Sequence, residues 1–292
     1  MELNNIIFPL LLLLFGYLYG KYSLSFLKKI KFNLLSDDQF SKPQAFHENP
    51  TNRLGGTIIF SLLMLVFLYF FFYKNIFFSE YISFCALFFT LGIVEDLRVD
   101  IRPKFRLLIM ILLLVLLIIF NKFYIEHSGL EFLNYLLQID VFALIFVCLC
   151  FLFIINGSNL IDGFNGLLGI HSLIIIAILS SINFINGNND LAYFLFYSSL
   201  LILIFLKFNF PKAQIFLGDS GAYLLGALIA VSVIKTSILN PSVHPFFFCI
   251  LLFYLFFEVF FSFFRKIIFV KQNPLLPDSQ HLHMKVYKFL FR

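Results

Sequence analysis

The sequence is poor in charge: only 13% of its 292 residues are Asp, Glu, Lys or Arg, and 61% are hydrophobic. A soluble domain is about half apolar and about a quarter charged, so this composition excludes a single soluble core. Tryptophan is absent, which leaves the 13 tyrosines to anchor the chain at membrane surfaces. The four cysteines lie inside apolar stretches without a Cys-x-x-Cys spacing, a pattern typical of thiols that pack as small hydrophobic side chains.

Long apolar stretches are what the sequence has in quantity. A helix that crosses a bilayer needs about 20 apolar residues, and open strands cannot satisfy their backbone in lipid. Nine stretches meet that length: 5–24, 55–73, 79–95, 105–121, 139–156, 166–185, 191–208, 219–237 and 245–264. We therefore predict an all-α, polytopic membrane protein with a single domain over residues 1–292.

Two segments need separate interpretation. No basic segment precedes the stretch 5–24, so we read it as a first membrane helix rather than as a cleaved signal peptide. The gap 122–138 is mildly amphipathic, and either a surface helix or a simple loop fits it.

The positive charges alternate along the chain. Of 21 Lys and Arg residues, 18 lie in alternate gaps between apolar stretches, and the other gaps hold only Lys74, Lys122 and Lys235. Because positive loops stay in the cytoplasm, the N-terminus is predicted outside and, with nine spans, the C-terminus inside. The net charge of +5 then favours anionic lipid headgroups rather than nucleic acid as a partner. The positive gaps also hold nearly every polar cluster, which predicts an enzyme facing the cytoplasm.

Two of these clusters lie in the first half of the chain. Arg53 ends the run Pro-Thr-Asn-Arg just before a Gly-Gly helix start, where backbone N–H groups and a guanidinium would suit a phosphate. A helix cap with a snorkelling arginine fits equally well. Glu95 and Asp96 close an apolar helix and repel each other unless a divalent ion or the nearby bases, among them Lys104 and Arg106, compensate. A solvated helix end is the alternative there.

The segment 156–167 is rich in Asn and Gly. Asn156, Asn159 and Asp162 recur every three residues, so on a helix they share one face. Amides can read a uracil or sugar edge, and a carboxylate can hold a metal or orient a nucleophile. A plain turn between helices would explain the glycines but not the spacing.

Two further clusters lie near the end of the chain. Asp219 opens an apolar helix, where it could be a simple cap or could bind Mg²⁺ together with water and phosphate. His281 and His283 lack the neighbouring Cys or His that zinc would need, so contact with a diphosphate fits them better. Glu258 lies inside an apolar stretch, and a structural pair with Arg265 is at least as plausible as catalysis.

Taken in order, the clusters resemble the motifs of the bacterial polyprenyl-phosphate N-acetylhexosamine-1-phosphate transferases, glycosyltransferase family 4. The resemblance covers about residues 45–290. PTNRLGG is similar to the family's PTPRxGG, GIVEDL to GxxDD, NGSNLIDGFNGL to NxxNxxDGxDGL, IFLGDSGAYLLG to FxGDxGS, and PDSQHLHMKVYK to its histidine loop. The PTNR form looks closer to the sugar-specific branch than to the branch that transfers phospho-MurNAc-pentapeptide.

The resemblance implies about ten or eleven helices around a cytoplasmic cleft in the bacterial inner membrane. It implies transfer of a sugar-1-phosphate from a UDP-N-acetylhexosamine to undecaprenyl phosphate, with Mg²⁺ (or Mn²⁺) and release of UMP, as the first step of a cell-envelope polysaccharide. A homodimer is common in the family.

The same resemblance implies roles for individual residues. By motif position, Asp219 would bind the metal, and Glu95 and Asp96 would activate or position the lipid phosphate. The remaining implied residues are Asp162, at the nucleotide site and counted as catalytic, and the substrate-binding Arg53, Lys104, Asn156, Asn159, Asn165, His281 and His283.

The chain departs from the family pattern at several positions. Glu95 replaces the first paired aspartate, Asn165 replaces the second aspartate of DGxDG, and Met284 replaces a further histidine. The chain is also expected to lack the family's last helix or helices. Two alternatives follow: a catalytically weakened relative that serves as an assembly subunit, and a lipid or solute transporter, whose polar residues should lie near mid-bilayer on broken helices.

Overall fold

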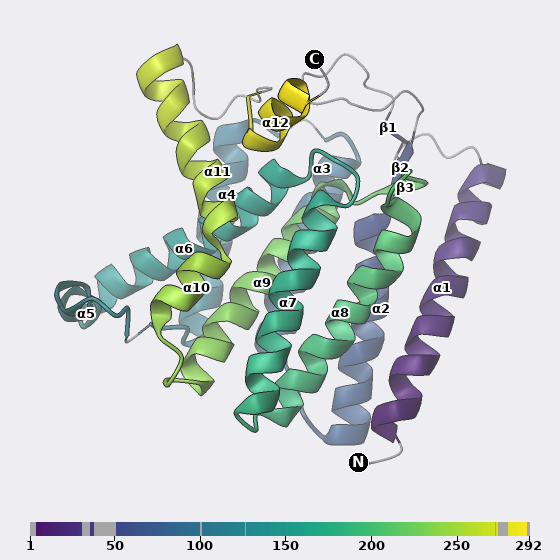
Figure 1. Ribbon diagram of the computed structural model, residues 1–292, viewed down its shortest axis with the longest axis horizontal. Coiled ribbons are helices and arrows are strands. Elements are labelled where there is room, and N and C mark those ends of the chain that lie inside the picture. Colours follow the sequence, from purple (N-terminus) through teal and green to yellow (C-terminus); the bar gives the residue numbers. More distant parts are fainter. Residues whose placement is uncertain are drawn as a thin grey trace.

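The computed structural model describes residues 4–30, 36–37, 51–99, 101–125, 127–271, 273 and 280–290, and within these ranges it is dominated by helices (Figure 1). The long helices are α1 (Asn4–Ile30), α2 (Gly55–Tyr69), α3 (Ser79–Asp96), α4 (Pro103–Asn121), α6 (Asp140–Ile161), α7 (Leu167–Ile185), α8 (Asn189–Asn209) and α9 (Gly218–Leu239). The shorter ones are α5 (Glu131–Leu137), α10 (Pro245–Leu251), α11 (Phe253–Phe264) and α12 (Leu282–Leu290). Two π-helical turns, η2 (Phe70–Lys74) and η3 (Arg265–Val270), extend α2 and α11.

This architecture confirms the prediction of an all-α polytopic membrane protein. Each of the nine predicted stretches coincides with one of these helices or with the pair α10 and α11. In the described part of the chain, seven helices are long and apolar enough to cross a membrane, and α10 with α11–η3, bent by 65°, would make an eighth. Helix α3 carries three acidic residues and is not among them, so the count of nine spans stays a prediction. The gap 122–138 contains the short helix α5 and is not a simple loop.

Helix α9 is the centre of the bundle. It packs against α2, α3, α6 and α7, and it is buried along almost its whole length. A helix that is apolar on every side is stable only when other helices or lipid surround it, and α9 is surrounded by helices. Helix α1, in contrast, exposes many large apolar side chains, as expected for a helix that faces lipid.

Glycines allow the first turn of α9 to wedge between α2 and α3. A Cβ atom added at Gly56 of α2 would overlap the backbone nitrogen of Gly221, and one added at Gly92 of α3 would overlap Cα of Ser220. Backbones that approach this closely leave no room for a side chain. At the opposite end of the same helix pair, Lys235 of α9 forms an ion pair with Glu80 of α3.

A small sheet joins the segments that precede α2 and α9. Strand β2 (Thr51–Arg53) pairs antiparallel with β1 (Ser36–Asp37) and parallel with β3 (Ile215–Phe216). The register places Arg53 opposite Phe216, three residues before Asp219. This sheet was not predicted, yet it brings two of the predicted clusters together.

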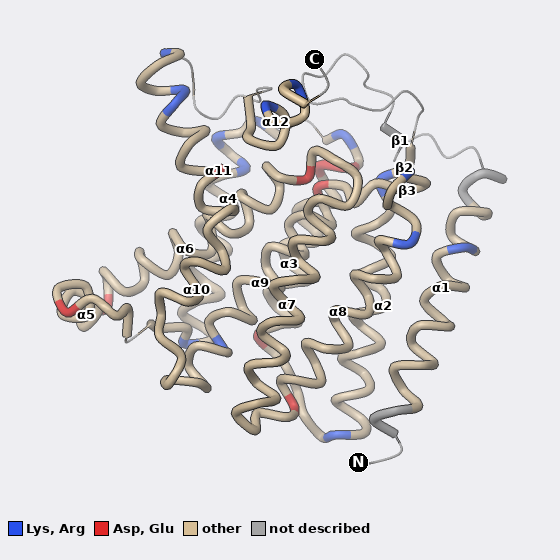
Figure 2. Tube along the Cα trace, in the orientation of Figure 1, with Lys and Arg blue, Asp and Glu red and all other residues tan. Residues whose placement is uncertain are grey.

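Lys and Arg gather at the end of the bundle that carries α12 and the sheet, and the opposite end, near the N-terminus, has few of them (Figure 2). Acidic positions also lie at the α12 end, close to the start of α9. The polar clusters therefore lie at helix ends on one face of the bundle.

Replacing Gly92 by Ala should destabilise the bundle, because the new methyl group would meet the backbone of Ser220, which cannot rotate away. Overpacking of this kind typically costs about 1–3 kcal/mol, so a lower melting temperature is expected in detergent solution. Gly169→Ala is the matched control: its Cβ would meet side-chain atoms alone, the nearest being a methyl carbon of Leu206 at 2.7 Å, at the end of a flexible side chain. Equal melting temperatures for the two variants would contradict the close α3–α9 contact.

Candidate active site

Asp96, the last residue of α3, caps the start of α9. Its Oδ1 accepts a hydrogen bond from the backbone N–H of Asp219 and its Oδ2 from that of Ser220, both at 2.9 Å. A carboxylate is favoured at a helix N-terminus by the unpaired N–H groups and the helix dipole. Asp96 is only 2% exposed, so the alternative of a solvated helix end is wrong for this residue.

Gly218 makes this cap sterically possible. Its φ of +79° lies in the left-handed region, and a Cβ atom there would lie 2.6 Å from Oδ2 of Asp96. Glycine is the residue that adopts this conformation without a steric penalty. The glycine of the Leu-Gly-Asp-Ser segment is therefore required by the contact between the two helices.

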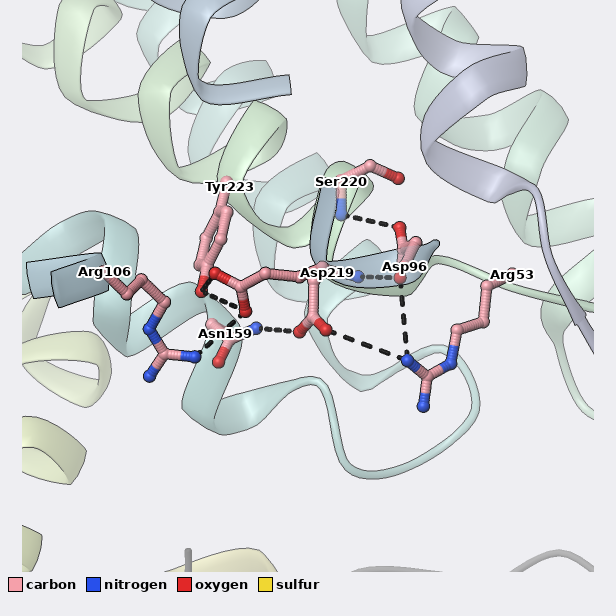
Figure 3. Close-up of polar contacts among 8 residues, drawn as sticks. Arg53, Asp96, Arg106, Asn159, Asp219, Ser220 and Tyr223 are labelled. Atoms are coloured by element: carbon pink, nitrogen blue, oxygen red, sulfur yellow. Dashed lines mark hydrogen bonds and ion pairs between the residues drawn. The ribbon is translucent and has the colours of Figure 1, made fainter. Parts of the chain in front are cut away.

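The side chain of Asp219 does not cap a helix, and it lies among polar groups (Figure 3). Its Oδ1 accepts a hydrogen bond from Nδ2 of Asn159 at 2.7 Å. Nη1 of Arg53 lies 3.8 Å from the other oxygen of Asp219 and 3.7 Å from Oδ1 of Asp96. A simple helix cap was the alternative role for Asp219, but Asp96 makes that cap instead. The side chain of Asp219 remains partly exposed, at 30%.

Glu95 forms a second polar group beside the first. Nη1 of Arg106 lies 3.0 Å from its Oε2, and Tyr223 Oη donates to the carboxylate at 3.3 Å (Figure 3). Neither Arg106 nor Tyr223 was predicted as a site residue. Lys104, which was predicted to bind substrate, is exposed in the first turn of α4. Arg106, two residues later, makes the contact with Glu95. The one available signal was helix geometry: residues two positions apart point to different sides of a helix, so Lys104 and Arg106 could not both face the carboxylates.

The segment at the end of α6 reaches the site only in part. Asn159 contacts Asp219 as described, whereas Nδ2 of Asn156 donates to the carbonyl of Leu152 in its own helix. Asn165 is exposed and donates to the carbonyl of Pro211 at 3.1 Å. Asn159 thus reaches the carboxylates, whereas Asn156 and Asn165 donate to backbone carbonyls.

Asp162 directly follows α6, and its pKa is raised to about 7. Burial is the largest cause, the negative charges of Asp219 and Asp96 add to it, and Arg53 acts in the opposite direction. A carboxyl group close to other carboxylates resists ionisation unless a cation compensates. The site is therefore short of positive charge.

The histidines lie at the start of α12, where His283 adjoins Gly163 of this segment. Nδ1 of His281 is 2.9 Å from Oε2 of Glu258, and Nδ1 of His283 is 3.3 Å from Oη of Tyr254. Glu258 thus pairs with His281 and not with Arg265, because the histidine segment folds back onto α11. Other parts of the predicted motifs, residues 47–50 and 274–279, lie outside the described residues.

The donor set fits a hard divalent cation. Four carboxylates, those of Glu95, Asp96, Asp162 and Asp219, accompany two guanidinium groups. Among the described residues, no group of three or more His, Cys, Asp or Glu is placed to hold a metal ion. Mg²⁺ commonly takes one or two carboxylates and completes its shell with water and phosphate. The partly exposed carboxylate of Asp219, oriented by Asn159, is the side chain that would hold it.

Comparison with known proteins gives consistent matches. The family model of glycosyl transferase family 4 matches residues 77–237. An undecaprenyl-phosphate alpha-N-acetylglucosaminyl 1-phosphate transferase of Thermotoga maritima is 34% identical over 139 residues, which is 48% of this chain and 41% of that protein. A phospho-N-acetylmuramoyl-pentapeptide-transferase of Dictyoglomus turgidum is 30% identical over 191 residues, 63% of this chain and 59% of that protein.

A third relative, the undecaprenyl-phosphate alpha-N-acetylglucosaminyl 1-phosphate transferase of Escherichia coli K12, is 26% identical over 171 residues, 57% of this chain and 46% of that protein. The matches span about half the length of these curated relatives. Both kinds of transferase are among the relatives, so the preference for the sugar-specific branch stays a prediction.

The raised pKa of Asp162 predicts how stability changes with pH in a buffer that contains a chelator. The folded-state pKa of about 7 lies above the usual value near 4, so the stabilising contribution of the protonated group is complete below about pH 4 and is lost as pH rises through about 7. Asp162→Asn removes this loss. Its melting temperature should therefore exceed that of the wild type more at pH 8 than at pH 5.

Differential scanning fluorimetry in detergent between pH 5 and 8 measures this difference. Asp190→Asn, at an exposed acid in the first turn of α8, is the control and should follow the wild type at every pH. A constant offset between Asp162→Asn and the wild type would show that Asp162 does not titrate in this range.

Proposed function

This chain belongs to glycosyl transferase family 4, and from that membership together with the carboxylate cluster we propose that it transfers an N-acetylhexosamine-1-phosphate from a UDP-sugar to undecaprenyl phosphate. The products are undecaprenyl-diphosphate-sugar and UMP. Such a reaction begins the synthesis of a cell-envelope polysaccharide on its lipid carrier. By the positive-inside pattern, the site faces the cytoplasm of the bacterial inner membrane.

One observation carries the proposal: the carboxylate of Asp219, partly exposed at the end of the central helix, is held between Asn159 and Arg53. The site lies at the ends of membrane helices, where a lipid phosphate and a water-soluble sugar nucleotide can meet. Phosphoryl transfer requires positioning and charge neutralisation more than covalent chemistry by the protein. Fixed carboxylates with two arginines beside them suit that requirement.

In the proposed reaction, an oxygen of the lipid phosphate attacks the phosphorus that bears the sugar. The bond from this phosphorus to the oxygen that bridges it to the UMP phosphate breaks, and UMP leaves with that oxygen. Atoms and charges balance without a further reactant. A divalent cation bound at the site would neutralise charge on the phosphate oxygens during transfer.

The residues of the chain supply the rest. Asp219 would hold the cation, and Asn159 fixes the orientation of that carboxylate through its 2.7 Å hydrogen bond. Arg53 adds positive charge beside the oxygens of Asp96 and Asp219, where it can meet a phosphate. Asp162 would lose its proton when the cation binds nearby. Asp96 keeps the start of α9 in place, which makes positioning its main contribution in this scheme.

Two alternatives from the sequence have different structural expectations. A transporter should carry its polar groups near mid-bilayer, and the clusters at one end of this bundle favour the transferase (Figure 2). An assembly subunit would keep the nucleotide site without turnover. The departures at Glu95 and Asn165 do not remove the contacts of Asp219, so catalysis is the reading that we propose.

Replacing Asp219 by Ala should reduce UMP release by at least about 10²–10³-fold, because the cation would lose its principal side-chain ligand. The measurement is UMP formed from UDP-N-acetylhexosamines and undecaprenyl phosphate by the full chain in detergent or nanodiscs. Chelation with EDTA should abolish release by the wild type, and Mg²⁺ or Mn²⁺ should restore it. A panel of UDP-sugars in the same assay identifies the sugar.

Asp96→Asn separates folding from chemistry in this experiment. An amide group would set one N–H against the N–H groups of α9, so both activity and melting temperature should fall. Asp219→Ala should lower activity with little change in melting temperature. Unchanged turnover in Asp219→Ala would sink the assignment, and binding of UDP-sugar by the wild type without UMP release would favour the assembly subunit.

A further inference from the structure

One face of α11 holds the whole histidine segment. Its side chains recur at helical spacing, and each contacts the chain between residues 280 and 285. Tyr254 contacts His283, and Glu258 contacts His281 and the N–H of Leu282. Further along, Phe261 contacts the ammonium of Lys285, and Arg265, just after the end of α11, donates to the carbonyl of Gln280. This stripe was not predicted, since it joins a membrane helix to a segment outside the membrane. It builds one wall of the site.

Glu258 is the centre of the stripe. It is fully buried, and its two oxygens accept from Nδ1 of His281 at 2.9 Å and from the backbone N–H of Leu282 at 2.8 Å. Because Nδ1 donates in this contact, the proton of His281 is fixed on that nitrogen, and Nε2 is turned away from α11.

His283 is placed by the same face. Its Nδ1 lies 3.3 Å from Tyr254 Oη and 3.8 Å from Glu258 Oε1, and its ring is parallel to that of His281 within 4°. Its Nε2 is buried and has no hydrogen-bond partner among the described residues. That nitrogen adjoins Gly163, where an added Cβ atom would lie only 2.7 Å away. His283 is thus aimed at the loop that carries Asp162.

We propose that Glu258 is a positioning residue, which orients His281 and His283 for contact with the diphosphate of the sugar nucleotide. The inference rests on the proposed function, because it assigns Glu258 a role at that site. Through this carboxylate, a group on a membrane helix sets the direction of the two imidazoles that we expect to meet the sugar nucleotide.

Simple anchoring of α12 does not account for Glu258. Met284, only 1% exposed, already buries an apolar side chain of α12. A buried acid is costly in an apolar helix, and a hydrophobic residue of similar volume holds two segments together at least as well as an ion pair does. What the carboxylate adds is a fixed proton position and a fixed direction for the imidazoles.

Two variants of Glu258 separate charge from hydrogen bonding. Glu258→Gln keeps an acceptor oxygen and loses the charge, and Glu258→Leu loses both while preserving apolar packing. With the full chain in nanodiscs, Glu258→Gln should raise KM for the UDP-sugar about 10-fold and Glu258→Leu about 100-fold, the range expected for losing a hydrogen bond to a charged group. KM for undecaprenyl phosphate should stay within about twofold. Equal changes in both KM values, or no change in either, would overturn the proposal.

A second readout does not depend on turnover. Diethylpyrocarbonate modifies accessible imidazoles, and both histidine side chains are buried in the wild type, at 1% and 6% exposure. Peptide mass spectrometry should find His281 and His283 modified several-fold faster in Glu258→Leu, with Glu131→Gln on the exposed surface of α5 as the matched control. Equal rates in Glu258→Leu and wild type would overturn the positioning role. A wild type that protects both histidines but releases no UMP would instead refute the proposed function alone.

Discussion

The carboxylate of Asp96 on two backbone N–H groups of α9 is the contact on which the geometry of the site depends. It joins the end of α3 to the start of the most buried helix, and the glycines around it allow the backbones to touch. Asp219 lies in the first turn of α9 and donates its own backbone N–H to Asp96, so backbone contacts and not a flexible loop set its position. The short pairing of β2 with β3 then brings Arg53 to the same point.

The site has two halves of different construction. Around α9, backbone contacts and glycines hold the carboxylates, and Asn159 and Arg53 complete the arrangement. Along α11, the histidines are held by side chains alone, through Tyr254 and Glu258. The loop that carries Asp162 and Gly163 lies between the halves, which explains why it is rich in glycine: His283 comes too close for any side chain at position 163.

Much of this arrangement could be predicted from the sequence, and the reasons for the misses are physical. Apolar length predicts the helices well, because lipid imposes a single requirement on every span. Asn159 and Asp162 both lie near Asp219, since both are local to the end of α6, and their roles stay predictions. The partners of Glu95 and Glu258 could not be read in the same way: Arg106, Tyr223 and His281 lie 11 to 128 residues away along the chain, and helix packing decides those pairs.

The two charged contacts between α3 and α9 also limit how the protein can move. Asp96 joins the helices at one end, and the ion pair of Glu80 with Lys235 joins them at the other. A piston-like slip of α9 by one turn, about 5.4 Å, would break both contacts together. Movement of α9 along α3 is therefore restrained at both ends of this helix pair, whereas the 65° bend between α10 and α11 lies outside these two contacts.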